Sequence, residues 1–286
     1  MGFKVSLHNI QCNALGDIEE YHKVWQESRY SLPYAVDGIV IKVNSMEFRE
    51  RLGVSGREPR WAVAYKFPAE RAVTKLLDIK INVGRTGSLN PFAVLEPVVV
   101  SGATLKMATL HNSDDIRRKD IRIGDTVWVQ RAGDVIPQVV KVIKKSANRG
   151  PKISYPKNCP VCRSKTIKES DEAVVRCENN INCKAQILGQ LKHFISKKTF
   201  NIDGFGEKQL IQFWDLGFVK NYIDIFKIEK HREQILQLEG WGKLSLNNLL
   251  ESCETSKNIQ FDKFIFALGI RYVGETISTL LAREFI

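Results

Sequence analysis

The sequence predicts a multidomain protein of the α+β class. A chain of 286 residues is longer than one compact hydrophobic core usually accommodates, so two or more domains are expected. Three patterns indicate what they are: closely spaced short strands, four clustered cysteines, and repeated glycine pairs that open helices. These patterns predict an OB-fold β-barrel, a small zinc finger and a helical helix-hairpin-helix domain, preceded by part of a strand-rich domain. The expected bounds are 1–70 for the strand-rich part, 71–147 for the barrel, 155–185 for the zinc finger and 186–286 for the helical domain.

Charge and hydropathy limit the function classes. Hydrophobic residues make up 43% of the chain and no apolar run reaches the length of a membrane span, which predicts a globular protein with the cytoplasm as its default location. The net charge of +11 and the pI near 9.3 indicate a polyanionic partner, because lysines and arginines that neutralise phosphates release counterions. Nucleic acid is the leading candidate. A basic surface without a partner is the alternative, and an anionic membrane is disfavoured because no basic amphipathic helix is evident.

The first 70 residues contain a polar helix, expected over 17–27, and two alternating strands, expected over 37–43 and 61–68. In each strand the period of two places a lysine, Lys42 or Lys66, on a face with small residues. A lysine beside glycine or alanine leaves room for a flat or bulky ligand next to its ammonium group. Lysine also protects sheet edges from aggregation, so either residue alone has that explanation, but both together favour a phosphate site.

The next stretch is predicted to be all strand. Short strands with turn signals between them suit a small barrel of the OB type, whose open face commonly binds nucleic acid. Arg85 and Arg131 fall at turns, where side chains reach outward; taken alone, each is also explained as a solvated arginine. The expected strands are 79–83, 93–100, 104–110, 126–131 and 135–143.

Four cysteines predict a structural zinc site. Cys159 and Cys162 lie two residues apart on a knuckle, and Cys177 and Cys183 return from a short hairpin, so four thiolates are available at the tetrahedral geometry that Zn²⁺ prefers. Disulfides or buried free thiols are the alternative, which the clustering and the lack of a signal peptide disfavour.

The helical region repeats a glycine motif. Gly204 and Gly206 flank one side chain just before a predicted helix, and Gly240 and Gly242 do so 36 residues later, with a weaker third copy over 267–274. Such glycines let a backbone approach a phosphate, while the next helix offers free amide groups and its positive dipole end. The motif therefore predicts DNA binding without sequence preference; a mere helix cap is the alternative.

In this order, the motifs of the chain resemble the middle and later part of bacterial NAD-dependent DNA ligases. The two lysine strands resemble the fourth and fifth nucleotidyltransferase motifs, so residues 1–70 would be the later part of a nucleotidyltransferase sheet. Three runs of the barrel resemble the family's OB-domain signatures, and the four cysteines and the glycine repeats follow in the family's order. The runs are Asp37–Lys42, Ala64–Pro68, Val83–Gly87, Ala108–Asn112 and Arg131–Val139.

The resemblance implies a reaction in three steps, in which a lysine takes AMP from NAD⁺, the AMP passes to the 5′-phosphate of a nick, and the 3′-hydroxyl displaces it. Lys42 and Lys66 would contact the phosphate and the adenylate, Arg29 would be a catalytic arginine, and Asp37 would assist metal or nucleotide positioning, with Mg²⁺ as the catalytic ion. Positioning and charge neutralisation are what nucleotidyl transfer chiefly requires. The residues that would hold the duplex around the nick are Arg85, Arg131, Val135 and Ile136.

The chain departs from the family at the nucleophile. The family's lysine lies in Lys-x-Asp-Gly, but here Ala35 and Asn201 stand two residues before the Asp-Gly pairs at Asp37 and Asp203. Compared with the family pattern, we also expect the chain to lack the N-terminal nicotinamide-binding region, the earlier half of the nucleotidyltransferase domain, the last helix-hairpin-helix unit and the terminal BRCT domain. We therefore expect a monomeric ligase fragment that binds nicked duplex DNA and no membrane but cannot adenylate itself, with a complementary N-terminal fragment as a candidate partner. The alternatives are a non-catalytic DNA-binding module with a structural zinc, and a zinc-ribbon scaffold for protein contacts, which the charge disfavours.

Overall fold

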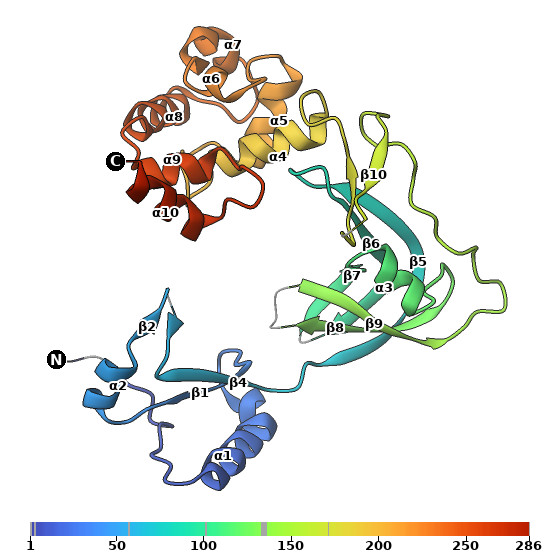
Figure 1. Cartoon of the computed structure of the whole chain (residues 1–286), viewed down its shortest axis with the longest axis vertical. Helices are drawn as coiled ribbons and strands as arrows, with labels where there is room; N and C mark the ends of the chain where they lie inside the picture. Colours follow the sequence, from blue (N-terminus) through green and yellow to red (C-terminus); the bar gives the residue numbers. More distant parts are fainter. Residues whose placement is uncertain are drawn as a thin grey trace. The chain divides into compact units, whose positions relative to one another are not determined.

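The computed structural model of the chain describes residues 2, 4–56, 58–100, 102–132, 136–170 and 172–285 (Figure 1). By packing, the chain divides into two compact units. The first comprises residues 1–77, 94–109 and 124–148, and the second comprises 78–93, 110–123 and 149–286.

The first 66 residues form a small α+β substructure in which the predicted helix and both lysine strands are present. Helix α1 packs on β1, and β1 pairs with β4 in an antiparallel two-stranded sheet. A second, shorter hairpin joins β2 to β3. The elements are α1 (Leu15–Ser28), a 3-10 turn (Arg29–Ser31), β1 (Gly38–Lys42), α2 (Met46–Leu52), β2 (Val54–Ser55), β3 (Glu58–Pro59) and β4 (Ala62–Lys66).

The register of β1 and β4 puts both predicted lysines on one face of the sheet. Gly38 lies opposite Lys66, and Lys42 lies opposite Ala62, and directly opposed residues of an antiparallel pair share a face. The two lysines stand at opposite ends of the five-residue ladder, about 13 Å apart at 3.3 Å per residue. A side chain at Gly38 would place its Cβ 2.6 Å from Cα of Lys66, so only glycine fits there.

Five strands close into a barrel in the order β5-β6-β7-β9-β8, as the sequence predicts for an OB fold. Strand β8 pairs antiparallel with both β5 and β9, and Leu76, Val127 and Val129 are fully buried. The strands are β5 (Arg71–Val83), β6 (Leu89–Val100), β7 (Ala103–Thr109), β8 (Thr126–Ala132) and β9 (Ile136–Lys144).

Three features of the barrel differ from the prediction. Strand β6 begins at Leu89 rather than at residue 93. Strand β5 begins at residue 71 rather than at the predicted residue 79. The sequence conceals its first part because the polar Thr74 occupies a buried position of the alternating pattern. The Thr74 hydroxyl donates to the Glu96 carbonyl at 2.6 Å. Helix α3 (Ser113–Arg118) follows β7 and was not expected. Its N-cap is Asn112, whose side chain accepts a hydrogen bond from the Asp115 amide at 2.8 Å.

The second unit continues into a short hairpin and then into helices, drawn from yellow to red in Figure 1. Strands β10 (Thr166–Lys168) and β11 (Val175–Cys177) pair antiparallel, and the helices after them share one core built around Phe194, Phe213 and Leu246. None of the described helices is long and apolar enough to cross a membrane. They are α4 (Lys184–Phe194), α5 (Glu207–Asp215), α6 (Tyr222–Ile225), a 3-10 turn (Ile228–His231), α7 (Arg232–Leu236), α8 (Lys243–Ser256), α9 (Phe261–Ala267) and α10 (Glu275–Glu284).

Three loops of the helical region share one backbone conformation. We define the first loop as residues 202–206, the second as 238–242 and the third as 270–274. In each, a residue with positive φ is followed two positions later by a glycine that caps the next helix: Gly206 for α5, Gly242 for α8 and Gly274 for α10. The carbonyl of each capping glycine accepts the first helical hydrogen bond at 3.0, 3.0 and 2.9 Å, respectively.

We predict that Gly38→Ala loosens the β1–β4 ladder, because the new methyl group would meet backbone atoms of Tyr65 and Lys66 at 2.6 Å. Overpacking of this kind costs about 1–3 kcal/mol, so the protection of β4 amides against hydrogen exchange should fall by about tenfold or more. Mass spectrometry of peptides that cover residues 62–66 measures this. Gly16→Ala is the matched control, since no described atom lies within 4 Å of its added methyl; equal exchange in both variants would contradict the prediction.

Candidate metal centre and active-site pocket

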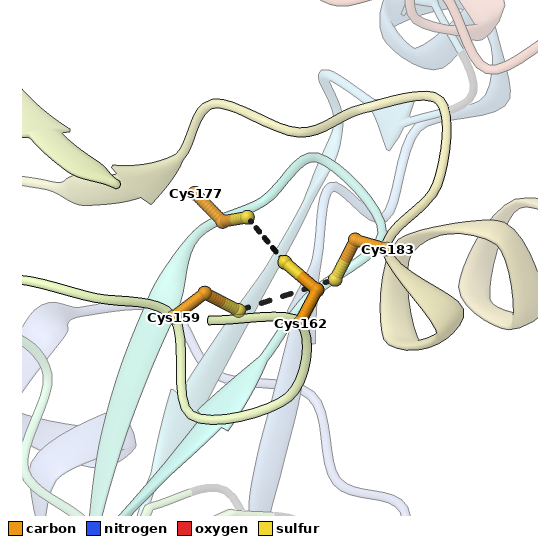
Figure 2. A group of neighbouring side chains, drawn as sticks. All are labelled: Cys159, Cys162, Cys177 and Cys183. Carbon is orange, nitrogen blue, oxygen red and sulfur yellow. Dashed lines mark hydrogen bonds between the residues drawn. The ribbon is translucent and has the colours of Figure 1, made fainter. Parts of the chain in front are cut away.

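The four predicted cysteines converge on one point. Their sulfur atoms all lie within 4.8 Å of one another, with Sγ of Cys159 4.0 Å from that of Cys183 and Sγ of Cys162 3.5 Å from that of Cys177 (Figure 2). Sulfurs bound at 2.3 Å around a tetrahedral zinc are separated by roughly 3.8 Å, so the cluster has the required size. All six cysteines are described and are free thiols, which excludes the disulfide alternative in this structure.

Local backbone contacts arrange the thiols. In the knuckle, the Cys159 amide donates to the Ser164 carbonyl at 2.7 Å and the Arg163 amide donates to the Cys159 carbonyl at 3.0 Å. Cys177 ends β11, and Cys183 is the N-cap of α4. Burial raises the pKa of the Cys183 thiol, although a hydrogen bond from the Gln186 amide acts in the opposite direction. Buried Leu89 and Val175 pack against the cluster and keep water away from it.

The thiols differ in acidity before a metal binds. Burial raises the pKa of the Cys177 thiol to about 12. Burial acts in the same direction on Cys162, but hydrogen bonds from the Ser164 hydroxyl and amide outweigh it and lower the pKa of this thiol to about 6. A zinc ion bound here would therefore displace the protons of the Cys177 and Cys183 thiols, and its affinity would fall as the solution becomes acidic. With four protein ligands, the site would be structural, since no position is left to activate water.

The metal centre is joined to the turn between β5 and β6. The Cys177 amide donates to the Gly87 carbonyl at 2.9 Å, and the Gln186 side chain donates to the Cys177 carbonyl at 3.3 Å. Gly87 has φ of +78°, and a Cβ there would lie 2.7 Å from the Cys177 carbonyl oxygen. Arg176 adds a hydrogen bond from its guanidinium to the Thr86 hydroxyl at 3.1 Å. Metal binding and the position of this turn are therefore coupled.

Arg85 lies on the same turn. The sequence predicts that its side chain reaches outward, but in the structure the side chain packs against the helical region. Its Cβ packs against α4, where a side chain at Gly189 would come within 2.8 Å, and its guanidinium lies 3.7 Å from the Cβ position at Gly269. His193 is also near: burial lowers the pKa of this imidazole, and the positive charge of Arg85 lowers it further, although a hydrogen bond to the Phe266 carbonyl acts in the opposite direction. The Arg85 side chain thus extends from the turn to the helical region, where it lies near Gly189 and Gly269.

A pocket of about 670 Å³ lies in the first unit. It brings together four predicted residues, because Arg29, Asp37 and Lys66 line it with Arg131 of β8. Lys42 is not among its lining residues and stands at the far end of the ladder. The remaining lining residues are Tyr30, Ala35, Val36, Phe67, Pro68, Ala69, Glu70 and Gly102.

Lys66 and Asp37 form an ion pair at the pocket. The hydrogen bond from the Lys66 ammonium holds the pKa of the Asp37 carboxyl below its ordinary value. Both side chains are about half exposed, which leaves them accessible to a ligand. His22 of α1 packs against β4. Its ring stacks on Tyr65 with the ring centroids 3.9 Å apart, and its Nε2 lies 3.2 Å from the Lys66 carbonyl oxygen.

Arg29 is held more firmly than the sequence indicates. Its guanidinium donates to Glu70 Oε1 at 2.6 Å and lies over the rings of Tyr30 and Phe67 at 4.8 and 5.4 Å. Only 15% of the side chain is exposed, and its Nε has no hydrogen-bond partner among the described residues. Neither Glu70 nor Tyr30 was predicted as a site residue. Glu70 is 41 positions from Arg29 in sequence, so no local signal indicates this contact.

A second group missed by sequence reasoning lies on the outer face of the barrel. The ring of Trp128 in β8 makes cation–π contacts with two side chains. The Arg71 guanidinium lies 5.5 Å and the Lys141 ammonium 4.2 Å from the ring centroid. The register places Trp128 opposite Val73 on β5 and Lys141 on β9, so these side chains share one face. An aromatic ring among lysines and arginines is a pattern that nucleic-acid-binding surfaces use.

The remaining predicted contacts are only partly described. Ile136 begins β9 and is 60% exposed, whereas Val135 lies outside the described residues. Gly204, Gly206, Gly240 and Gly242 are exposed. Within the described part of the chain, nothing lies within 4 Å of a Cβ added at Gly242, whose φ of −126° suits any residue. The protein's own packing therefore gives no reason for glycine at this position.

Three stretches of the chain match domain models of one protein family. Residues 1–70 match the NAD-dependent DNA ligase adenylation domain, residues 73–151 match the NAD-dependent DNA ligase OB-fold domain, and residues 158–185 match the NAD-dependent DNA ligase C4 zinc finger domain. Together they cover more than half of the chain and contain both the pocket and the four cysteines.

Curated proteins similar to the chain are named DNA ligase. That of Halalkalibacterium halodurans is 46% identical over 287 residues, which cover 100% of this chain and 42% of the relative. That of Listeria monocytogenes serotype 4b is 47% identical over 287 residues, with the same coverage of 100% and 42%. That of Gluconobacter oxydans is 46% identical over 269 residues, which cover 94% of this chain and 39% of the relative. The chain thus spans about two fifths of the length of these relatives, at 39% to 42%.

We predict one zinc per chain, bound by the four clustered thiolates. Cys177→Ser should retain less than one equivalent, because an alcohol is a poor ligand where a thiolate is required, and the parent should lose zinc as the pH falls. Elemental analysis of freshly purified protein measures the stoichiometry. Cys12→Ser, which changes a cysteine outside the cluster, should keep the full equivalent. Parent protein without zinc, or a Cys177→Ser variant with full zinc, would contradict the assignment.

Proposed function

This chain belongs to the NAD-dependent DNA ligase family, and we propose that it takes part in sealing nicks in duplex DNA during replication and repair. The observation that carries the proposal is the pocket in which Arg29, Asp37 and Lys66 meet Arg131 of the barrel. Three cations outnumber the two carboxylates, Asp37 and Glu70, that line the cavity. This excess of positive charge suits a nucleotide phosphate, because nucleotidyl transfer depends on positioning and on neutralising phosphate oxygens.

Each pocket residue has a distinct task in this proposal. Lys66 would exchange its ion pair with Asp37 for the phosphate of AMP derived from NAD⁺ and would neutralise that phosphate. The Asp37 carboxylate would then be available to hold Mg²⁺. Glu70 and the two aromatic rings hold Arg29 in place, so its guanidinium meets the phosphate without losing rotational freedom on binding. Lys42, at the other end of the ladder, would contact a more distant part of the nucleotide or a phosphate of DNA.

We assign DNA binding in part to the helical region, as helix-hairpin-helix units. The first and second loops present Gly204, Gly206, Gly240 and Gly242 at the surface ahead of α5 and α8. Open space around Gly242, the exposed N-cap of α8, supports this assignment, since a phosphate backbone can approach the glycine without meeting a side chain. Such contacts read backbone shape and carry no base specificity.

The barrel would supply the remaining DNA contacts. Arg131 and the exposed Ile136 are assigned to the duplex around the nick, with Val135 beside them in sequence. Trp128 with its two flanking cations adds a surface suited to phosphate and sugar. For Arg85, the packing against α4 favours orientation of the helical region beside the duplex over a purely direct contact.

The nucleophile must come from elsewhere, since no Lys-x-Asp-Gly occurs in the sequence. Both faces of the β1–β4 sheet carry exposed apolar side chains, with Val40 at 61% and Val63 at 63% exposure. Exposed apolar faces suit packing against the rest of a nucleotidyltransferase domain, so we propose a complementary fragment that carries the lysine as the partner. The second candidate function, favoured by the same missing lysine, is a non-catalytic module that binds DNA and holds a structural zinc.

The chain alone should form no covalent adenylate with NAD⁺ or ATP, because Lys42 and Lys66 steady phosphates and neither lies in the nucleophile motif. Radiolabelled NAD⁺ followed by a denaturing gel measures the product. Labelled AMP that stays on the isolated chain would contradict this. Mixing the chain with a fragment of a relative that contains Lys-x-Asp-Gly is the positive control, and the label should then appear on that fragment.

A nick that already carries AMP distinguishes the two candidate functions. A ligase by descent should seal it slowly, with Mg²⁺ present, and Lys66→Met should abolish the sealing. A binding module should bind the nick and release it unchanged. Lys23→Met, at an exposed position on α1 outside the pocket, is the matched control for the loss of one charge.

The chain should bind nicked and intact duplexes of any sequence, with affinity that falls about tenfold or more from low to physiological salt. Arg131→Glu should weaken binding to all sequences alike. Gly242→Val should weaken it without altering charge or fold, and fluorescence anisotropy with thermal unfolding measures both properties. Gly16→Val, the same addition at another open glycine, should bind like the parent. Salt-insensitive binding, or full affinity in Gly242→Val, would favour the protein-scaffold alternative.

A further inference from the structure

The third loop differs from the first two in charge and in its contacts. Its second position is Arg271, where the first two loops have the acidic Asp203 and Glu239. Its positive-φ position is Tyr272, with φ of +67°, where the other two loops have glycines. A tyrosine in this conformation is strained, so its side chain is expected to have a task that glycine cannot perform.

The loop from β10 to β11 places a carboxylate on this third loop. Glu172 accepts a hydrogen bond from the Tyr272 hydroxyl at 2.6 Å and forms an ion pair with Arg271. Arg176, next to the cysteine that ends β11, donates to the other oxygen of Glu172 at 3.1 Å. Three donors from two segments therefore surround one carboxylate, of which 16% is exposed.

This arrangement has the composition of a phosphate site. Two guanidinium groups and a hydroxyl are donors that bind phosphate as well as carboxylate, and Gly274, the N-cap of α10, lies two residues after Tyr272. Arg271 also forms an ion pair with Glu169 of the same loop at 3.4 Å, and its buried Nε has no hydrogen-bond partner among the described residues. The Tyr272 side chain is 77% exposed, so the site opens to solvent on one side. The hydrogen bond from Tyr272 also lowers the pKa of Glu172, which keeps the carboxylate ionised at neutral pH.

We propose that the third loop is a DNA phosphate site that Glu172 occupies in the absence of DNA. Binding of a duplex exchanges one anion for another: the Glu172 carboxylate leaves Arg271 and Tyr272, and a backbone phosphate takes its place. The exchange makes and breaks hydrogen bonds only. The inference rests on the proposed DNA binding and adds to it that the β10–β11 loop lowers the affinity of the helical region for DNA until a duplex competes.

The test is the DNA affinity of the full chain carrying Glu172→Gln. The variant removes the competing charge, so affinity for a duplex at low salt should rise about threefold, the size expected for one partly exposed ion pair. The dependence of log affinity on log salt should also steepen by about one, as for one additional phosphate contact. Glu178→Gln is the matched control: it loses the same charge in the same module, is exposed, and has no ion pair among the described residues.

The outcomes separate this inference from the proposed function. If Glu172→Gln binds DNA as the parent does, or more weakly, Glu172 only stabilises the contact between the two segments and the inference is wrong, while DNA binding stands. If no variant binds DNA, the proposed function fails first. Arg271→Gln in the Glu172→Gln background should return affinity and salt slope to the parental values or below, and a double variant that keeps the gain would place the phosphate elsewhere. Hydrogen exchange of α10 amides confirms that each variant is folded.

Discussion

The convergence of four thiols is the constraint on which the second unit depends. The segments that carry them are short, and a hairpin of two three-residue strands has too little apolar surface to fold by burial alone. The cluster fixes Cys177 against the Gly87 carbonyl, and it places Cys183 at the first position before α4. The turn of the barrel and the first helix of the helical region are thereby set by one metal-sized site, so a structural ion can govern surfaces that it does not touch.

The pocket follows a different principle, in which small residues make room for charges. Gly38 permits close contact of two strands, and that contact brings Asp37 beside Lys66. The Arg29 guanidinium, enclosed by Glu70 and aromatic rings, is pre-oriented by contacts that a ligand need not supply. Arg29 is held by its neighbours, whereas Lys66 is accessible from solvent. This combination suits a pocket that binds a nucleotide and then releases it after transfer.

The three loops illustrate how one backbone can serve different tasks. In all three, a positive-φ residue and a capping glycine present the start of a helix at the surface. Two loops leave that surface open, while the third holds a carboxylate of the neighbouring hairpin with Arg271 and Tyr272. A repeated scaffold with one altered charge can thus join the cysteine hairpin to the helical region.

The sequence by itself determined the local elements and the chemistry of the site. Cysteine spacing identified the four thiols that converge, alternation identified the strands with Lys42 and Lys66, and glycine spacing identified the loops before α5 and α8, because each signal is carried by residues close in sequence. The predicted extent of β5 was too short because Thr74 is polar yet buried, which conceals the alternation of the strand. Only the tertiary structure decided which of the predicted residues meet: it joined Arg29 to Glu70, separated Lys42 from the pocket, and turned Arg85 toward α4. These contacts depend on the register and packing of distant segments, and no periodicity along the chain encodes them.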